Sequence, residues 1–303
     1  MKKIKVSACV ITYNQEDFLR KCLEGAISQI VNFDYEIVIG DDFSSDLSEQ
    51  ISREYAAKYP NLIRYKKREN NTGMIHNWQK TILECRGNYI AICEGDDYWT
   101  DPYKLQKQVD FLESNPEYVL TFHPVLILHP DGQIKEDHIT NVPKNHETIE
   151  SLAIYGNYIH TPSVVFRNVI KKFPEKMNES PIGDYFIYML LAEFGKLKKL
   201  DDAMAVYRYG IGVHSSLSDQ IQNEKWRKTL SLIHSEMKNN AIRNILYYKL
   251  EAEKLIERPY WLKKGMTSEQ WLDAENLAPL ISLKKLGAIL KIKIFNKFRF
   301  SIR

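Results

Sequence analysis

The first hundred residues alternate between apolar runs and segments whose apolar residues recur at helical spacing. Apolar runs predict buried strands at residues 4–12, 35–40 and 88–93, and a further strand is expected at 62–67. The segments between them carry apolar residues three or four positions apart, which is typical of amphipathic helices. Strands and helices in alternation indicate a parallel sheet with crossover helices. The expected fold class is therefore α/β, with a Rossmann-like, mostly parallel sheet.

The pattern changes after residue 100. A helix is expected in "DPYKLQKQVDFL", with Asp101 as its N-cap and Pro102 as its first residue. One strand is expected over residues 118–134, with a turn at "PDG". Short strands are expected at 163–167 and 204–208, on either side of a helix at 183–195. One long helix is expected from residue 218 to about residue 256, so the chain should end in a helical C-terminal extension.

The composition is ordinary for a globular protein, with 44% hydrophobic and 27% charged residues. The net charge of +3 is nearly neutral for 303 residues and indicates no nucleic-acid-binding surface. The four cysteines lack CxxC spacing, which favours buried free thiols over a disulfide or metal site. No signal peptide and no apolar span of 18 residues is recognisable, so a cytoplasmic protein is expected.

Three polar clusters follow the expected strands: "TYNQ" at 12–15, "GDDFSSD" at 40–46 and "EGDD" at 94–97. Ligands of open α/β sheets bind beyond the carboxyl ends of the strands, so these clusters are expected to line one crevice. For part of the second cluster a structural interpretation stays open, because Ser44, Ser45 or Asp46 could cap the following helix.

The crevice is rich in carboxylates, and the chain lacks both the dinucleotide-binding GxGxxG motif and the P-loop motif. A phosphorylated ligand in such a crevice needs a bridging cation, and oxygen ligands of this kind suit Mg²⁺ or Mn²⁺. Asp96 and Asp97 can lie side by side if one holds the metal ion while the other hydrogen-bonds to the ligand.

The segments "VITYN", "DDFSSD", "NNTGMIHNW" and "YIAICEGDDYWTDP" resemble, in order and approximate spacing, the motifs of family 2 glycosyltransferases with a GT-A fold. "GDYFIYMLL" and "YRYGIGVHSS" resemble two further segments of that family, and the resemblance covers residues 3–216. It implies a GT-A domain at 1–216, with a nucleotide-sugar-binding half (1–125) and an acceptor half (126–216). A helical extension at 217–303 would follow.

The resemblance also implies roles for matching residues. Tyr13 would stack on the nucleobase, and Asp41 or Asp42 would hydrogen-bond to it. Asp96 would contact the ribose, and Asp97 would coordinate the metal ion. The whole nucleotide-sugar site would comprise Thr12, Tyr13, Asp41, Asp42, Asn77, Asp96 and Arg208. A structural ion pair would account for Arg208 equally well.

Asp184 matches the family's catalytic base, which would deprotonate an acceptor hydroxyl in an inverting reaction. His214 could complete the metal site, or could be a solvated surface histidine. His160 or Thr161 could contact the acceptor. Two positions depart from the family pattern: Glu94 stands where many members have Asp, and Gly183 stands where Glu is commoner.

The segment 276–303 carries Lys and Arg among apolar residues and contains no acid. This composition is typical of an interfacial anchor on an anionic membrane, although a terminal element that packs on the body would show the same pattern. Bacterial members of the family often extend lipid-linked oligosaccharides at the cytoplasmic face of the inner membrane.

The combined expectation is a Mn²⁺- or Mg²⁺-dependent transferase that is cytoplasmic or peripheral on that membrane. It would move a hexose or N-acetylhexosamine from a UDP-sugar to a saccharide acceptor, such as one linked to undecaprenyl diphosphate. The product would belong to a surface polysaccharide, O-antigen or capsule.

Two alternatives stay open. A sugar-phosphate nucleotidylyltransferase would need a glycine-rich basic loop near the N-terminus, and "CVITYNQEDF" contains no glycine. A non-catalytic, membrane-associated assembly subunit would tolerate replacement of Asp97 and Asp184. A nucleic-acid partner is not expected, because the conspicuous basic cluster is confined to the tail.

Overall fold

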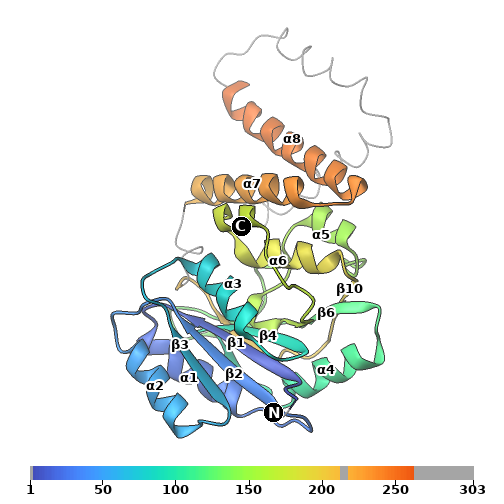
Figure 1. Ribbon diagram of the computed structural model, residues 1–303. Coiled ribbons are helices and arrows are strands. Elements are labelled where there is room, and N and C mark those ends of the chain that lie inside the picture. Colours follow the sequence, from blue (N-terminus) through green and yellow to red (C-terminus); the bar gives the residue numbers. More distant parts are fainter. Residues whose placement is uncertain (1–2, 212–217, 263–303) are drawn as a thin grey trace.

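The structure is a computed structural model that describes residues 3–211 and 218–262 (Figure 1). Its larger sheet has seven strands in the order β10-β6-β9-β4-β1-β2-β3. In chain order these are β1 (Val6–Thr12), β2 (Tyr35–Asp41), β3 (Ile63–Lys67), β4 (Tyr89–Glu94), β6 (Tyr118–Phe122), β9 (Val165–Arg167) and β10 (Lys196–Lys199). Only β9 runs antiparallel to its neighbours, β4 and β6. The predicted mostly parallel α/β sheet is therefore confirmed.

The two faces of this sheet are covered by different helices, because side chains alternate along each strand. Val6, Ala8 and Val10 of β1 join a buried cluster with α1 (Glu16–Ile27), α2 (Ser48–Lys58) and α4 (Lys104–Ser114). Cys9 and Ile11 join the opposite cluster with α3 (Met74–Glu84) and α6 (Gly183–Ala192). All four cysteines are buried free thiols, as expected.

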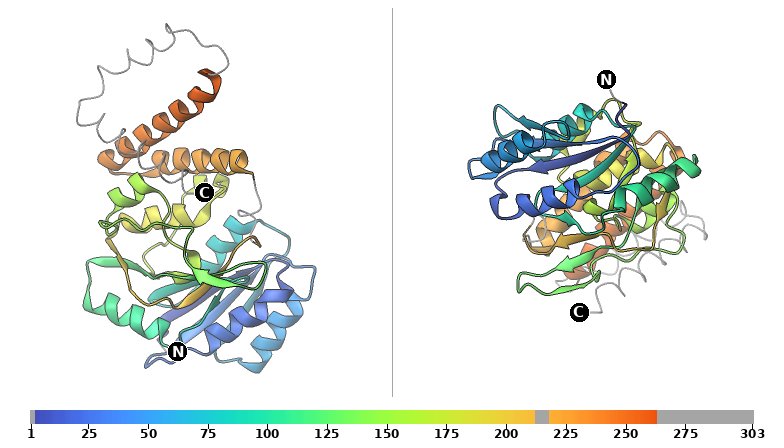
Figure 2. Two further views of the ribbon diagram at one scale, coloured as in Figure 1. Left: turned by 180° about the vertical axis from the view of Figure 1, so that it is seen from behind. Right: turned by 90° about the horizontal axis from the view of Figure 1, so that it is seen from below.

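A second sheet of four strands has the order β5-β11-β7-β8. It contains β5 (Tyr98–Trp99), β7 (Leu126–Leu128), β8 (Ile134–Glu136) and β11 (Ala205–Arg208). The light-green β7–β8 hairpin is visible in the view from behind (Figure 2). The prediction of one strand over 118–134 is wrong. Pro124 has no N–H to donate, and after it the chain leaves the larger sheet and begins β7 in the smaller one.

The predicted start of α4 is also wrong. The helix begins at Lys104 and not at Pro102. Gln29, which follows α1, holds this end of the helix: its Oε1 accepts from the Leu105 N–H at 3.0 Å and its Nε2 donates to the Asp101 carbonyl at 2.9 Å. Asp101 still contributes locally, because its Oδ1 accepts from the Tyr103 N–H at 2.7 Å.

The expected C-terminal helix is two helices, α7 (Asp219–Glu236) and α8 (Asn240–Leu262). The chain turns between them, where Lys238 N–H donates to Glu193 Oε1 and Asn239 Oδ1 accepts from the Ala241 N–H. In Figure 1 these orange helices lie at one end of the molecule, beyond α5 (Ile149–Tyr155) and α6. None of the helices in the described ranges combines the length and the apolar character needed to cross a membrane.

The two expected halves of the domain share one sheet. Strands β1 to β4 and β6 come from residues 1–125, and β9 and β10 come from residues 126–216. The segment 276–303, with its basic tail, lies outside the described residues.

Candidate active site

Strands β1, β2 and β4 end at the same level of the larger sheet. Thr12 lies opposite Asp41 in the β1–β2 ladder, and Ile11 lies opposite Glu94 in the β1–β4 ladder. The three predicted polar clusters therefore meet at one edge, where parallel sheets bind their ligands.

The loops after β1 and β2 are tied together by side-chain hydrogen bonds. Asn14 N–H donates to Ser44 Oγ at 3.0 Å, and Asn14 Oδ1 accepts from the Ser45 N–H at 2.8 Å. Asn14 and Phe43 adopt left-handed φ angles of 51° and 69°. Tyr13 and Phe43 are each 47% exposed, so an aromatic ring projects from each loop. Tyr13 is thus accessible for the predicted stacking, and Phe43 is an aromatic residue that the sequence did not single out.

Asp46 fastens the same two loops by capping both following helices. Its Oδ2 accepts from the Glu16 N–H of α1 at 3.0 Å, and its Oδ1 accepts from the Ser48 N–H of α2 at 2.9 Å. Glu16 Oε2 accepts in return from the Leu47 N–H at 2.6 Å. These hydrogen bonds give Asp46 a structural role at the start of both helices, although the N-cap residue of α2 is Leu47.

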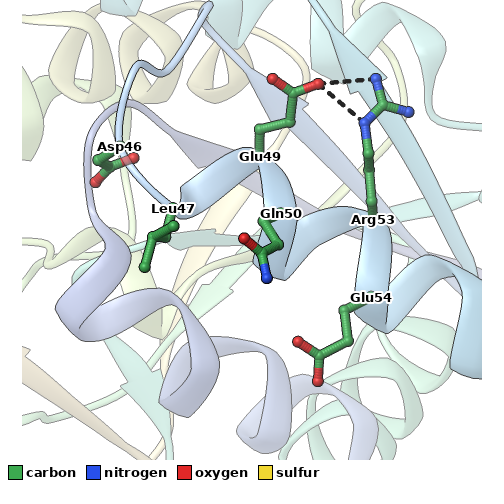
Figure 3. Close-up of a pocket in the computed structure, with 6 residues that line it drawn as sticks. All are labelled: Asp46, Leu47, Glu49, Gln50, Arg53 and Glu54. Atoms are coloured by element: carbon green, nitrogen blue, oxygen red, sulfur yellow. Dashed lines mark hydrogen bonds and ion pairs between the residues drawn. The ribbon is translucent and has the colours of Figure 1, made fainter.

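Figure 3 shows a surface pocket of about 560 Å³ along the start of α2. It is lined by Asp46, Leu47, Glu49, Gln50, Arg53 and Glu54. Its most prominent charges, Glu49 and Arg53, pair with each other at 2.9 Å. None of its lining residues belongs to the predicted nucleotide-sugar site, so this pocket contributes nothing to the crevice.

Asp41 and Asp42 are buried and held in place. Asp41 accepts from the Ser44 N–H at 2.8 Å and from the Tyr65 hydroxyl at 2.6 Å. Asp42 Oδ1 accepts from both the N–H and the hydroxyl of Thr72 at 2.8 Å. A carboxylate oxygen can accept more than one hydrogen bond, so either residue keeps capacity for a ligand.

Asn77 does not present a free amide to the crevice. It is 2% exposed, its Nδ2 donates to the Gly40 carbonyl at 2.8 Å and its Oδ1 accepts from Arg68 Nε at 2.9 Å. The structure thus supports a role in tying α3 to β2, in place of the ligand contact that the resemblance implies. Trp78, on the same helix, is a core residue as expected.

The segment "EGDD" forms a compact acidic cluster. Ligand oxygens of Glu94, Asp96 and Asp97 all lie within 4.8 Å of one another. A Cβ atom on Gly95 would lie 2.5 Å from Gln15 Oε1 and 3.1 Å from Thr12 Oγ1, so the cluster packs closely against the residues at the end of β1. Both of those oxygens are buried without a hydrogen-bond partner among the described residues. Unsatisfied oxygens facing the cluster are a feature of a binding site.

Burial raises the pKa of all three carboxyls, and mutual repulsion adds to the rise at Glu94 and Asp97. Asp97 Oδ1 accepts from the Arg208 N–H at 2.9 Å, whereas Asp97 Oδ2 is buried with no partner in the described part of the chain. A divalent cation would relieve this repulsion and satisfy the free oxygen, so the residues fit Mg²⁺ or Mn²⁺.

The guanidinium of Arg208 lies over two aromatic rings, with its Cζ 4.9 Å from the centre of Phe18 and 5.1 Å from that of Tyr98. Its Nε is buried without a partner within the described residues. The positive charge of Arg208 opposes part of the effect of burial on the pKa of Asp96. Among the described residues, the two aromatic rings, and not an ion pair, therefore orient the Arg208 guanidinium beside the acidic cluster.

Asp184 lies in the first turn of α6, and its charge adds to the raised pKa of Glu94, which places it near the acidic cluster. Asn157 Nδ2 donates to Asp184 Oδ2 at 2.6 Å. A Cβ atom on Gly183 would lie 2.5 Å from Ile75 Cδ1 and 3.1 Å from the Trp78 ring. The start of α6 therefore packs directly against α3.

His160 and Thr161 lie at the edge of this region. His160 Nε2 is 3.1 Å from Asp137 Oδ2, and its ring lies 4.9 Å from that of Tyr207. Thr161 is buried in the short 3₁₀ helix η1 (Thr161–Ser163). Burial and then the charge of Asp97 raise the pKa of Tyr207, so Tyr207 lies near the acidic cluster.

Sequence reasoning missed Asn157 and Tyr207. Tyr207 precedes Arg208 within "YRYGIGVHSS", a segment that resembles the family, and that position was the available signal. Asn157 stands in no recognised motif. His214, the second predicted metal ligand, lies outside the described residues.

Comparisons with known proteins agree with this arrangement. Residues 7–211 match the family model "Glycosyl transferase family 2". The uncharacterized protein Mb1547 of Mycobacterium bovis is 36% identical over 249 residues, covering 78% of this chain and 71% of that protein. The crystal structure of S. aureus TarS 1–349 in complex with UDP superposes with a TM-score of 0.61 at 18% identity, covering 95% of this chain and 81% of that one.

A second solved structure is the mannosyltransferase PcManGT from Pyrobaculum calidifontis in complex with GDP-Man and Mn²⁺. It has a TM-score of 0.59 at 14% identity and covers 97% of this chain and 87% of that one. At such identities the two structures show the fold alone, and that fold is GT-A.

The family model extends from within β1 to the residues just after β11. It therefore includes the strand ends, the acidic cluster, Asp184 and Arg208. This match favours glycosyl transfer over the nucleotidylyltransferase alternative. Since the matched region is more than half of the chain, the chain belongs to glycosyl transferase family 2 and is a glycosyltransferase.

Proposed function

We propose that the protein is a metal-dependent, inverting glycosyltransferase that takes a hexose or N-acetylhexosamine from a nucleotide sugar, with a UDP-sugar as the first candidate. The observation that carries the proposal is the acidic cluster beyond β4, in which Asp97 keeps a buried oxygen without a partner in the described part of the chain. TarS in complex with UDP supports the uridine nucleotide, and PcManGT with GDP-Man and Mn²⁺ supports a metal-bound nucleotide sugar.

The donor would bind across the ends of β1, β2 and β4. Tyr13 is exposed and suited to stack on the base, and the buried oxygen of Thr12 faces the same crevice. Asp41 or Asp42 would accept a hydrogen bond from the base. Asp96 would bind the ribose, and Arg208, held between Phe18 and Tyr98, would face the diphosphate.

Asp97 would hold the metal ion, with Glu94 beside it and His214 as a further ligand. When bound, Mn²⁺ or Mg²⁺ would neutralise the negative charge of the departing nucleoside diphosphate. Asp184 would accept the proton of the acceptor hydroxyl as the hydroxyl oxygen bonds to the anomeric carbon. The bond from that carbon to the diphosphate oxygen breaks, its electron pair stays on the diphosphate, and the anomeric configuration inverts.

The acceptor is proposed to be a saccharide, linked to a lipid such as undecaprenyl diphosphate, in the synthesis of a surface polysaccharide. His160 and Thr161 would contact it, and the tilted ring contact of His160 with Tyr207, beside the acidic cluster, supports this role. The basic segment 276–303 is proposed to hold the enzyme on the cytoplasmic face of an anionic membrane.

Titration calorimetry with UDP, with and without Mn²⁺, tests the donor site. The native protein should bind UDP in a metal-dependent manner, and Asp97→Ala should abolish that dependence because it removes the buried oxygen. Asp110→Ala, an exposed carboxylate on α4, is the matched control and should bind as the native protein does. Metal-independent binding of UDP would contradict the metal site. Full metal-dependent binding by Asp97→Ala would place the metal elsewhere.

A further inference from the structure

The carboxylate of Asp184 is oriented by an amide from a distant loop. Asn157 Nδ2 donates to Asp184 Oδ2 at 2.6 Å, and Asn157 Oδ1 accepts from the Ile159 N–H at 3.2 Å. The second bond fixes which end of the Asn157 amide faces Asp184. An N–H donor stabilises the charged form of a carboxylate, which is the form that can accept a proton.

Asn157 is in turn positioned by the C-terminal helices. It follows Gly156, which ends α5 with a left-handed φ of 84°. A Cβ atom on Gly156 would lie 3.0 Å from the ring of Trp226 in α7 and 3.3 Å from Lys249 Nζ in α8. Helices α7 and α8 therefore pack directly against Gly156, the residue that precedes Asn157.

Lys249 fastens the same end of α5. It is 5% exposed, and its Nζ donates to the carbonyls of Ile154 at 3.1 Å and Ala153 at 3.4 Å. Its Nζ also lies 5.1 Å from the centre of the Trp226 ring. A buried ammonium on the last carbonyls of a helix satisfies groups that the helix itself cannot, and complements the helix dipole.

We propose that Asn157 is a positioning residue for Asp184, and that the helical extension, through Lys249 and Trp226, braces the catalytic base. The proposal rests on the proposed function, in which Asp184 takes the proton of the acceptor. The extension then contributes to turnover, although it lies on the far side of α5 and α6 from the strand ends that bind the donor (Figure 1). Variants of Asn157 or Lys249 should accordingly lower turnover without weakening donor binding.

Release of UDP with water as acceptor tests the role of Asn157. The substrate would be whichever of UDP-glucose and UDP-GlcNAc is hydrolysed faster. Asn157→Leu, similar in size but without a donor, should lower kcat about 100-fold, while the donor KM and the Kd for UDP change less than about twofold. Asn157→Asp should lose as much, because two carboxylates would face each other.

A double-mutant cycle distinguishes loss of the Asn157–Asp184 contact from a general disturbance of the fold. Asp184→Asn should lower kcat by 100-fold or more with UDP binding intact, and adding Asn157→Leu should then cause no further loss. A native kcat in Asn157→Leu, or an equal further loss in the Asp184→Asn background, would overturn the positioning role. A native rate in Asp184→Asn would instead overturn the proposed base. The same cycle on the free energy of unfolding, which needs no substrate, should also be non-additive, and additivity there would overturn the contact.

The support of Asn157 by the C-terminal helices is tested by replacing Lys249 in α8. Lys249→Met should lower kcat about tenfold with the Kd for UDP unchanged, because Asn157 loses its support. Arg243→Met removes an exposed charge from the same helix and should leave kcat unchanged. Equal values of kcat in the two variants, or a parallel loss of UDP binding in Lys249→Met, would contradict the brace.

Discussion

At the scale of single residues, buried carboxylates in this protein fall into two kinds. Glu36 is 2% exposed, and its oxygens accept from Ser7, Arg64 and Arg86. Asp97 is equally buried but leaves one oxygen unpaired within the described residues. The first arrangement stabilises the fold by itself, whereas the second is complete only with a ligand. Burial alone therefore does not identify a site, whereas an unsatisfied oxygen within a cluster of three carboxylates points to one.

Glu36→Gln tests the first kind. Burial raises the pKa of Glu36, but the hydrogen bonds from Arg86, Ser7 and Arg64 outweigh it, so the pKa is lowered overall. The carboxylate therefore stabilises the fold fully above its unfolded pKa of about 4.3, and this contribution is lost as the pH falls through the folded value. We expect Glu36→Gln to lower the free energy of unfolding by about 2 kcal/mol at pH 7, and by progressively less below pH 4. Urea unfolding at several pH values measures this.

Glu113→Gln is the control for that experiment. Glu113 pairs with Lys5 at the surface, where an ion pair contributes at most about 1 kcal/mol. A difference between Glu36→Gln and the native protein that stays constant from pH 7 to pH 3.5 would show that shape, and not charge, determines the effect.

At the scale of helices and strands, the sequence predicts those elements that follow from the local spacing of apolar residues. Strands β1 to β4 and the three helices between them were expected at nearly the right places, because β1, β2 and β4 are buried on both faces and each helix carries an apolar stripe. The three polar clusters were expected together because parallel strands end at one edge. The start of α4 was not predictable, since Gln29 determines it from more than seventy residues away.

The same limit applies to the site. The motif residues at strand ends, Thr12, Asp41 and Glu94, follow from their place in the pattern. The burial of Asn77 depends on Arg68 and on the backbone of β2, and the contact of Asn157 with Asp184 joins the segment after α5 to the first turn of α6. Such contacts leave no periodic trace in a single sequence. The break between α7 and α8 is of the same kind, because Glu193 of a distant turn helps to fix it.

Asp46→Ala tests how much one side chain stabilises the protein when it accepts a hydrogen bond from the first N–H of two helices. We expect a loss of about 2 kcal/mol in the free energy of unfolding, roughly twice the usual effect of an N-cap. Asp46→Asn should lose about half as much, since its amide keeps one acceptor oxygen. Asp110→Ala, on the exposed side of α4, should change stability by less than about 0.5 kcal/mol. Equal stability of Asp46→Ala and Asp110→Ala in urea unfolding would refute the double cap.

At the scale of the whole molecule, the fold keeps donor binding and the proposed base on different supports. The loops proposed to bind the donor follow β1, β2 and β4 and rest on α1 and α2. Asp184 and its brace belong to α5, α6, α7 and α8, which share the opposite core cluster (Figure 1). The seven-stranded sheet joins the two, because residues from both expected halves contribute strands to it.

Removal of the segment after Leu280 tests membrane attachment. The truncated protein should no longer sediment with vesicles of phosphatidylglycerol and phosphatidylcholine, because seven Lys and Arg residues are lost. Its Kd for UDP should be unchanged, because all residues proposed to bind the donor or the metal ion lie before residue 280. Vesicles of phosphatidylcholine alone are the control, and undiminished binding of the truncated protein to the anionic vesicles would rule out the anchor.

The hydrogen bonds that join Asn14 to Ser44 and Ser45, and Asp46 to Glu16, also bear on attempts to re-engineer the enzyme. A loop transplanted alone from another family member would leave its native neighbour with mismatched donors and acceptors. A change of nucleotide preference should therefore be attempted by exchanging residues 12–16 and 41–48 together, as one transplantable unit.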